Sequence, residues 1–261
     1  MKAARRKPII ISTIAAAIIA IALCYRIFTG DVTFSYIEPD TNSYTVKGID
    51  VSAHNGDIDF HTVANEGYRF VYIKASEGRT FRDKRFADNH RKAVAAGLAV
   101  GAYHFFRFDV PGEEQAHNLM DAINGKALHL PLAIDVETQS NASFYSSAAI
   151  TRELRNMVDE LSVYGYPLII YTNKRGNNSF INNDFGDCGL WICSFVAPDK
   201  VRGWTFWQYS HSGEVKGVTG DVDLDVWNGK ADNWDNEIRK NKSKFSTAEW
   251  LRSAINADNS R

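Results

Sequence analysis

Two carboxylates close a short apolar segment in the middle of the chain. Residues 130–138 read LPLAIDVET, so a proline and a run of apolar residues lead to Asp135 and Glu137. Such a run is typical of a buried strand, and side chains two residues apart on a strand point to the same face. We therefore expect Asp135 and Glu137 to lie side by side, where like-charge repulsion raises the pKa of a carboxyl group.

Two further acids fall on segments that read as strands. Asp50 closes the segment VKGID, and Asp223 lies in GDVDLDVW. In a barrel of parallel strands, side chains at the C-terminal ends meet in one pocket, and we expect all four acids there. A carboxyl group that keeps its proton near neutral pH can donate it to the leaving oxygen of a sugar. The set therefore predicts hydrolysis of a glycosidic bond, whereas a single D-x-E pair, which is common on strands, would not.

Aromatic side chains fall on the same expected strands and offer flat faces for sugar rings. The candidate substrate-binding residues are Tyr103, Phe105, Tyr171, Trp191, Trp207, Gln208 and Tyr209. The alternative is that most of the aromatic residues are simply part of the core.

The elements that must position these residues follow from the hydrophobic pattern. Strands are expected at 44–52, 68–76, 98–108, 130–137 and 166–173, with helices between them at 59–67, 82–97, 112–124 and 147–165. This alternation favours a parallel sheet. Three more strands, at 189–195, 203–210 and 222–228, follow with little helix between them. An open doubly wound sheet is the alternative, but its usual glycine-rich phosphate loop is missing, so the count favours an α/β barrel of eight strands.

Composition excludes several classes of partner. The 261 residues carry a net charge of −1, which gives no broad basic surface for nucleic acid. The three cysteines have neither zinc-site spacing nor the pattern of a disulfide framework. The acidic segment 221–225 lacks the glycine and the distal glutamate of a calcium loop. We therefore expect no nucleic-acid partner, no metal and no cofactor.

The N-terminus reads as a membrane anchor. Four basic residues precede an uncharged segment from Ile9 to Tyr25, which is close to the shortest length that spans a bilayer. We expect residues 1–8 to stay in the cytoplasm, residues 9–28 to form an uncleaved transmembrane helix and residues 29–45 to be a linker. A cleaved secretion signal and a lipoprotein signal at Cys24 are the alternatives. All three place the bulk of the protein outside the cytoplasm, in the periplasm or at the cell surface.

The C-terminal residues 230–261 are polar and charged. Ser246 and Glu249 have the spacing of a capping box, which predicts a short terminal helix beginning there. The pattern indicates no role for this extension.

Eight segments, in order along the chain, together resemble glycoside hydrolase family 25, the lysozymes also called Chalaropsis-type muramidases. They are KGIDVSAHNGDIDF (47–60), FVYIKASEG (70–78), VGAYHFFRF (100–108), PLAIDVE (131–137), IIYTN (169–173), LWICSF (190–195), FWQYS (206–210) and VDLDVWNG (222–229). The resemblance covers residues 46–229. One departure is Cys193, which stands where the family tends to have another small residue.

The resemblance implies an irregular TIM-like (β/α)5(β)3 barrel that hydrolyses the β-1,4 bond between N-acetylmuramic acid and N-acetylglucosamine. Glu137 matches the general acid, and Asp135 matches the residue that orients the substrate's own N-acetyl group. Asp50 and Asp223 match the two remaining acids of the site. The implied partner is the glycan strand of peptidoglycan. A peptidoglycan-binding module without turnover, or a hydrolase of another N-acetylhexosamine polymer, stays open from the residues alone.

Overall fold

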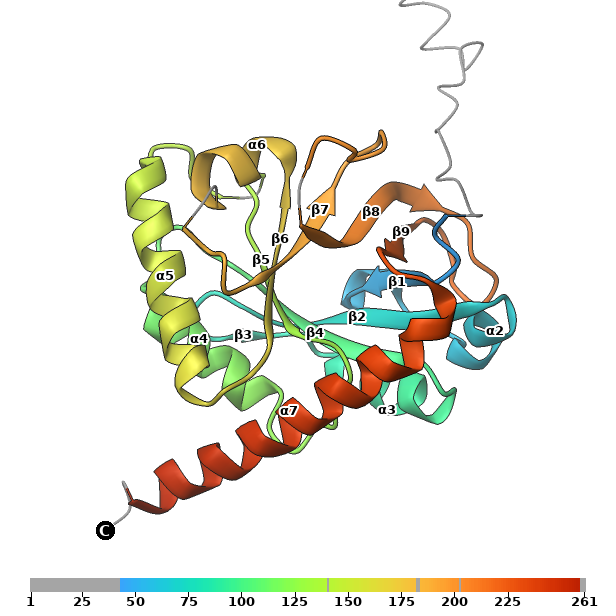
Figure 1. The fold of residues 1–261 in the computed structure, drawn as a ribbon, viewed down its shortest axis with the longest axis horizontal. Coiled ribbons are helices and arrows are strands. Elements are labelled where there is room, and N and C mark those ends of the chain that lie inside the picture. The colour runs from blue at the N-terminus through green and yellow to red at the C-terminus, as the bar shows by residue number, and fades with distance from the viewer. Residues whose placement is uncertain (1–42, 140, 182–183, 202, 259–261) are drawn as a thin grey trace, which may run out of the picture. The chain divides into compact units, whose positions relative to one another are not determined.

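The computed structural model describes residues 43–139, 141–181, 184–201 and 203–258, and within these ranges eight strands close into a barrel (Figure 1). The barrel strands are β1 (Lys47–Val51), β2 (Tyr68–Glu77), β4 (Ala99–Phe105), β5 (Leu132–Asp135), β6 (Leu168–Asn173), β7 (Gly189–Cys193), β8 (Trp204–Gly213) and β9 (Val222–Trp227). Pairing of β1 with both β2 and β9 completes the closure, and the two-residue strand β3 (Phe81–Arg82) pairs antiparallel with the last residues of β2. The expected eight-stranded α/β barrel is confirmed.

All neighbouring barrel strands are parallel except at β9, which runs antiparallel to β8 and to β1. Only residues 214–221 join β8 to β9. Such a connection is too short for the crossover that a parallel pair requires. The beginning of β9 therefore lies beside the C-terminal ends of the parallel strands, and Asp223 is paired with Asp50.

Helices make the crossovers in the first half of the barrel. These are α2 (Phe60–Asn65), α3 (Phe86–Ala95), α4 (Gly112–Ala122) and α5 (Ser147–Val163), while α6 (Lys174–Gly176) is a single turn that continues irregularly to Ile181. A further short turn, η1 (Ala53–Asn55), follows β1. The clearest apolar stripe of the sequence, on α5, is buried against the sheet. The last three strands have no full helix between them, as the sequence predicted.

The interior of the barrel is filled with aromatic rings. Tyr72 stacks on Trp191 with ring centroids 4.5 Å apart, and the ring centroids of Phe70 and Phe206 are 5.0 Å apart. Glycine makes room for them, because a Cβ atom at Gly48 would lie 2.2 Å from the Phe70 ring. The barrel is therefore a packed core with a floor of rings, as parallel barrels of this kind are.

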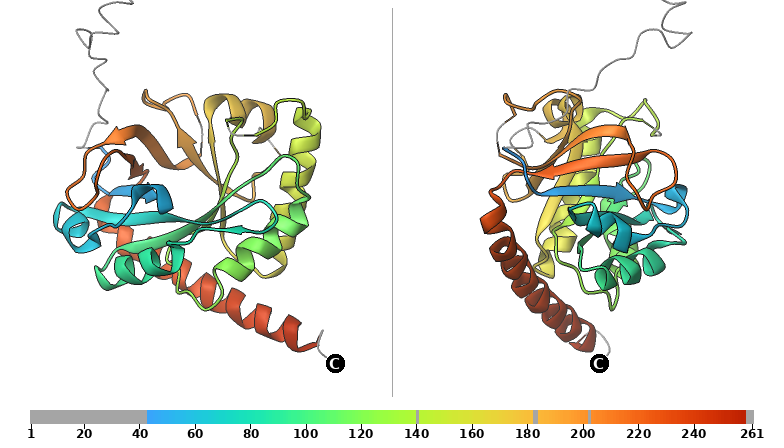
Figure 2. Two further views of the ribbon diagram at one scale, coloured as in Figure 1. Left: turned by 180° about the vertical axis from the view of Figure 1, so that it is seen from behind. Right: turned by 90° about the vertical axis from the view of Figure 1, so that its right-hand side faces the viewer.

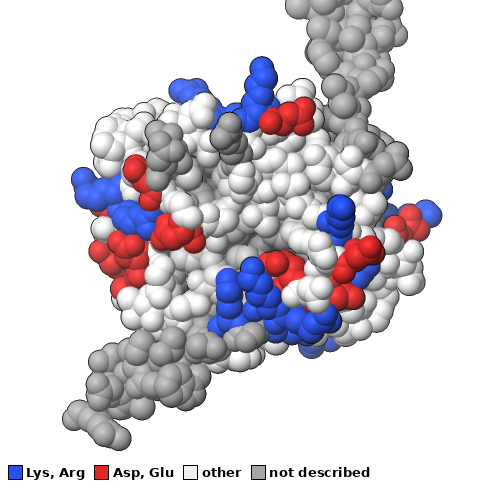
Figure 3. Space-filling model, in the orientation of Figure 1, with Lys and Arg blue, Asp and Glu red and all other residues white. Residues whose placement is uncertain are grey.

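The C-terminal helix α7 (Ala231–Asp258) lies across the end of the barrel at which the parallel strands begin (Figures 1 and 2). Trp234 packs against Phe70 and Trp227, with ring centroids 5.6 and 5.1 Å apart, and Phe245 packs against Tyr166. On the opposite side of α7, the described residues between 231 and 246 are exposed and largely polar or charged, and lysine and arginine side chains gather over this part of the helix (Figure 3).

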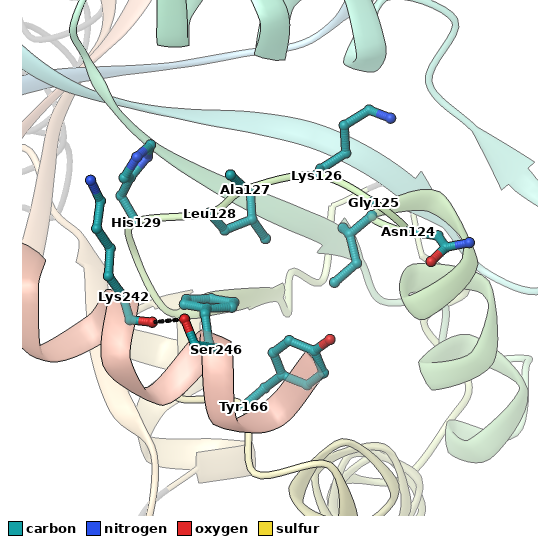
Figure 4. Close-up of a pocket in the computed structure, with 11 residues that line it drawn as sticks. Asn124, Gly125, Lys126, Ala127, Leu128, His129, Tyr166, Lys242 and Ser246 are labelled. Carbon is teal, nitrogen blue, oxygen red and sulfur yellow. Dashed lines mark hydrogen bonds between the residues drawn. The ribbon is translucent and has the colours of Figure 1, made fainter. Parts of the chain in front are cut away.

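The predicted short helix that begins at Ser246 is wrong. Ser246 lies inside α7, and its hydroxyl donates to the carbonyl of Lys242 at 3.1 Å, beside a pocket that α7 forms with residues 123–129 (Figure 4). The helix is long because Trp234, at its first turn, and Phe245 are both buried against the barrel. Their spacing of eleven residues puts them on one helical face, which was the signal that the capping-box pattern obscured.

Among the described residues, no helix has the length and apolar character needed to cross a bilayer. The predicted anchor at 9–28, the basic segment before it and most of the linker lie outside the described ranges.

We predict that Trp234→Ala lowers the free energy of unfolding by about 3–5 kcal/mol, the usual range for removal of a buried tryptophan ring. Trp234 is 2% exposed. Urea unfolding of the full chain, followed by circular dichroism, measures the change. Lys240→Ala, on the exposed side of the same helix, is the control and should change stability by less than about 0.5 kcal/mol. Equal stability of the two variants would show that α7 is not part of the folded barrel.

Candidate active site

A pocket of about 340 Å³ opens where the parallel strands end and β9 begins. It brings together all four predicted acids and most of the predicted binding residues. Its lining is Asp50, Tyr103, Phe105, Asp135, Glu137, Gln139, Tyr171, Trp191, Gln208, His211 and Asp223. The expectation that Asp223 closes a parallel strand is wrong, because it lies near the start of the antiparallel β9. Because β9 runs in the opposite direction, its beginning lies beside the ends of the parallel strands, and Asp223 reaches the same pocket.

Asp135 and Glu137 both line this pocket. Asp135 is the last residue of β5, which is shorter than the expected strand 130–137, and Glu137 lies two residues beyond its end. Burial is the largest cause that raises the pKa of Asp135, and the charge of Glu137 adds to it. Burial also raises the pKa of Glu137, opposed by the neighbouring Tyr171 hydroxyl and by His211. Desolvation, rather than the repulsion expected from the sequence, is therefore the main reason that the pKa values of both groups are raised.

Asp135 has an oxygen with no protein partner. Its Oδ1 is buried and accepts no hydrogen bond from any described residue. A buried acceptor without a donor is costly and uncommon in folded proteins. Because Asp135 lines the pocket, we infer that this oxygen is left for a donor on a bound molecule.

A chain of hydrogen bonds positions Asp50 on the far side of the pocket. The Tyr171 hydroxyl donates to Oε1 of Gln208 at 2.7 Å, and Nε2 of Gln208 donates to Oδ2 of Asp50 at 2.7 Å. Burial raises the pKa of Asp50 well above its usual value, with smaller contributions from Asp223 and Asp225. Three strands, β6, β8 and β1, thus fix one carboxyl group.

Trp207 and Tyr209 do not line the pocket, so that part of the prediction is wrong. Gln208 stands between them and points inward, and successive side chains on a strand point to opposite faces. Their rings pack outside the barrel in a cluster with Trp204 and Val226. Nε1 of Trp207 donates to the carbonyl of Ser194 at 2.6 Å.

Asp225 is a fifth acid that the sequence did not single out. It is fully buried, and its Oδ1 accepts a hydrogen bond from Nε1 of Trp191 at 2.8 Å. Burial raises its pKa well above the usual value. Its position two residues after Asp223 on β9 places both on the inner face of the barrel, which is the spacing that drew attention to Asp135 and Glu137.

His211 is the second missed residue, and no pattern in the sequence distinguishes it. Its Nδ1 lies 2.8 Å from Oδ1 of Asp223. That hydrogen bond is the main reason that the pKa of His211 is raised to about 10. The raised pKa favours the protonated form of the ring, which places a positive charge beside the four acids that line the pocket.

Within the described ranges, no group of three or more histidine, cysteine, aspartate or glutamate side chains is arranged to hold a metal ion.

Known proteins are similar to this chain in sequence and in fold. A sequence profile of the glycosyl hydrolases family 25 matches residues 49–218. The autolytic lysozyme of Clostridium acetobutylicum is 35% identical over 182 residues, or 69% of this chain and 55% of that protein. Lysozyme M1 of Streptomyces globisporus is 33% identical over 204 residues, or 71% of this chain and 69% of that protein. The chain thus spans little more than half of the Clostridium relative.

A solved structure extends the likeness to three dimensions. The family 25 glycosyl hydrolase of Bacillus anthracis is similar with a TM-score of 0.71 at 32% identity, and the match covers 78% of this chain and 98% of that one. The profile match includes Asp50, Asp135 and Glu137. Sequence and fold agree, and the chain belongs to the glycosyl hydrolases of family 25.

Proposed function

We propose that this protein is a muramidase that cleaves the β-1,4 bond between N-acetylmuramic acid and N-acetylglucosamine in peptidoglycan. The observation that carries the proposal is the pair of carboxyl groups at one pocket, the buried Asp135 and the half-buried Glu137, both with raised pKa values. The lysozymes among its relatives support the choice of substrate.

Glu137 is the proposed general acid. Its raised pKa favours the protonated form, which donates to the glycosidic oxygen as the bond from C1 to that oxygen breaks. The resulting carboxylate then takes a proton from water, whose oxygen bonds to C1. Glu137 is less deeply buried than Asp135, which suits a group that must exchange protons with both sugar and water.

Asp135 is proposed to hold the substrate's N-acetyl group. Its partnerless Oδ1 can accept the amide N–H of that group, so that the acetyl carbonyl oxygen is turned toward C1 and bonds to it while the leaving sugar departs. Substrate-assisted routes of this kind need no separate protein nucleophile. Water later displaces the acetyl oxygen and restores the N-acetyl group.

The other lining residues divide into those that meet the sugar and those that support them. Tyr103 and Phe105 are half-buried and present ring surface to the pocket. Tyr171 and Trp191 are nearly closed to solvent and act mainly through their hydrogen bonds to Gln208 and Asp225. We infer that Asp50 and Asp223 stabilise the positive charge that develops at the anomeric carbon.

The presence of these carboxyl groups favours turnover over the alternative of a silent peptidoglycan-binding module. We also propose that residues 9–28 anchor the protein in a membrane with the barrel outside the cytoplasm, because four basic residues precede an uncharged segment there.

Glu137→Gln is expected to lower kcat by about 10²–10⁴-fold, because an amide keeps the shape of the side chain but has no acidic proton to give. Turnover of purified peptidoglycan and binding of soluble glycan fragments are the measurements, and binding should survive. Glu214→Gln makes the same chemical change at an exposed position and should have no effect. A near-normal rate in Glu137→Gln would remove this residue from the acid role.

Asp135→Asn is expected to lower kcat by about 10²-fold or more, the usual effect of removing one preorganised electrostatic contact. The asparagine can still approach the N-acetyl group but presents no negative charge to its N–H. Steady-state kinetics on the same substrate check this, with the exposed Asp199→Asn as control. Unchanged kinetics would contradict the neighbouring-group mechanism.

Membrane attachment is tested by deletion of residues 1–28. The full chain is expected to sediment with membranes and to resist a carbonate wash, whereas the shortened chain should remain in the supernatant. A full chain that washes off the membrane would contradict the anchor.

A further inference from the structure

A cysteine, a histidine and an aspartate lie in series at the edge of the pocket. Sγ of Cys193 is 3.6 Å from Nε2 of His211, and Nδ1 of His211 is 2.8 Å from Oδ1 of Asp223. Three different strands, β7, β8 and β9, bring them together. A nucleophile, a base and an acid that orients the base form the arrangement that activates a thiol in enzymes. The proposed glycoside cleavage makes no use of Cys193.

The thiol is on the pocket side of the barrel. Cys193 closes β7 two residues after Trp191, which lines the pocket, and both belong to the interior cluster that includes Tyr171. Ile192, between them, belongs to the outer cluster. The side chain of His211 lines the pocket and is 46% exposed. The imidazole therefore lies between the pocket and the sulfur, and Cys193 itself is 9% exposed.

The second described cysteine provides a comparison within the same molecule. Cys188 is also a free thiol and is less buried than Cys193. Burial raises the pKa of Cys188 to about 12, and because the thiolate is the nucleophile, Cys188 should react slowly near neutral pH. Accessibility alone would favour Cys188, whereas the contact with imidazole favours Cys193.

We propose that Cys193 is a nucleophilic thiol, positioned by His211 and Asp223, that is covalently modified by small electrophiles and peroxides. The sulfur reacts as thiolate while its proton resides on His211. With an alkyl iodide, a carbon–sulfur bond forms and iodide leaves. With hydrogen peroxide, the sulfur bonds to one oxygen as the O–O bond breaks, and the departing hydroxide takes the proton from His211 to give water. The sulfur is oxidised by two electrons to a sulfenic acid, and the peroxide is reduced.

Modification of Cys193 also blocks the pocket, a consequence that rests on the proposed function. Atoms added to Sγ occupy the 3.6 Å space in which Nε2 of His211 now lies. The ring must move, so Asp223 loses its hydrogen-bond donor. Phe195, whose ring centroid is 4.9 Å from that of His211, limits where the ring can go. Peptidoglycan cleavage should therefore fall in step with labelling.

The test is timed labelling of the folded full chain with limiting iodoacetamide at neutral pH, with each cysteine quantified by peptide mass spectrometry. We expect Cys193 to be labelled at least about tenfold faster than Cys188. His211→Gln should lower the Cys193 rate by about tenfold, since it removes the imidazole. His117→Gln, at an exposed histidine on α4, is the matched control and should change nothing.

The ratio of the labelling rates of Cys193 and Cys188 is measured in the wild-type chain. The test therefore remains decisive even if His211→Gln fails to fold. Labelling of Cys193 that is no faster than that of Cys188 overturns the proposal, whether or not the protein cleaves peptidoglycan. For the second part, Cys193→Ala should keep its activity and resist iodoacetamide. If iodoacetamide inactivates Cys193→Ala as fast as it inactivates the wild type, Cys193 is not the site whose modification blocks the pocket. A chain inactive from the start would refute the proposed function, while the labelling ratio would still decide on the thiol.

Discussion

A carboxylate taken out of water loses its hydration, and at the mouth of this barrel several lose it together. Asp50, Asp135 and Asp225 are 7%, 9% and 0% exposed. Burial makes the charged form of each of these groups costly and raises its pKa. The structure offsets part of this cost with two donors, Gln208 to Asp50 and Trp191 to Asp225. The remaining cost is what raises the pKa values on which acid catalysis depends.

The rest of the fold maintains that burial. The stacked rings of Tyr72 and Trp191 are buried inside the barrel, and we infer that they keep water from reaching the acids through it. Trp234 of α7 covers the opposite end of the barrel, next to Phe70. The reversal of β9 brings Asp223 and Asp225 to the same site as the parallel strands. Packing far from the pocket and protonation within it are therefore linked by the exclusion of water.

Sequence patterns were sufficient where one local rule decides the outcome. The apolar run correctly predicted the strand that ends at Asp135. Glu137 lies two residues beyond the end of that strand, yet it lines the same pocket, as the i, i+2 spacing indicated. The patterns failed where the direction of a strand, or contacts with residues distant in the sequence, determine which side chains reach the site. Nothing near Asp223 indicates that its strand is antiparallel, and the role of His211 depends on residues from two other strands.

Two errors arose because a residue type was given more weight than periodicity. Trp207 and Tyr209 suit sugar binding by type, but the alternation that points Gln208 inward turns both outward. Ser246 has the spacing of a helix cap, yet Trp234 and Phe245 extend the helix through it by packing on the barrel. Asp225 follows Asp223 at the same i, i+2 spacing that separates Asp135 and Glu137. That spacing alone indicates a second inward-facing acid on β9.

The central claim is that the buried acids cut peptidoglycan on the N-acetylmuramic acid side of the glycosidic oxygen. The most direct test is to digest purified peptidoglycan with the full chain, reduce the released fragments and identify their reducing ends by mass spectrometry. The account predicts new reducing-end N-acetylmuramic acid, at a rate that depends on Glu137. Fragments that end in reducing N-acetylglucosamine, or an intact wall after treatment with the folded protein, would contradict it.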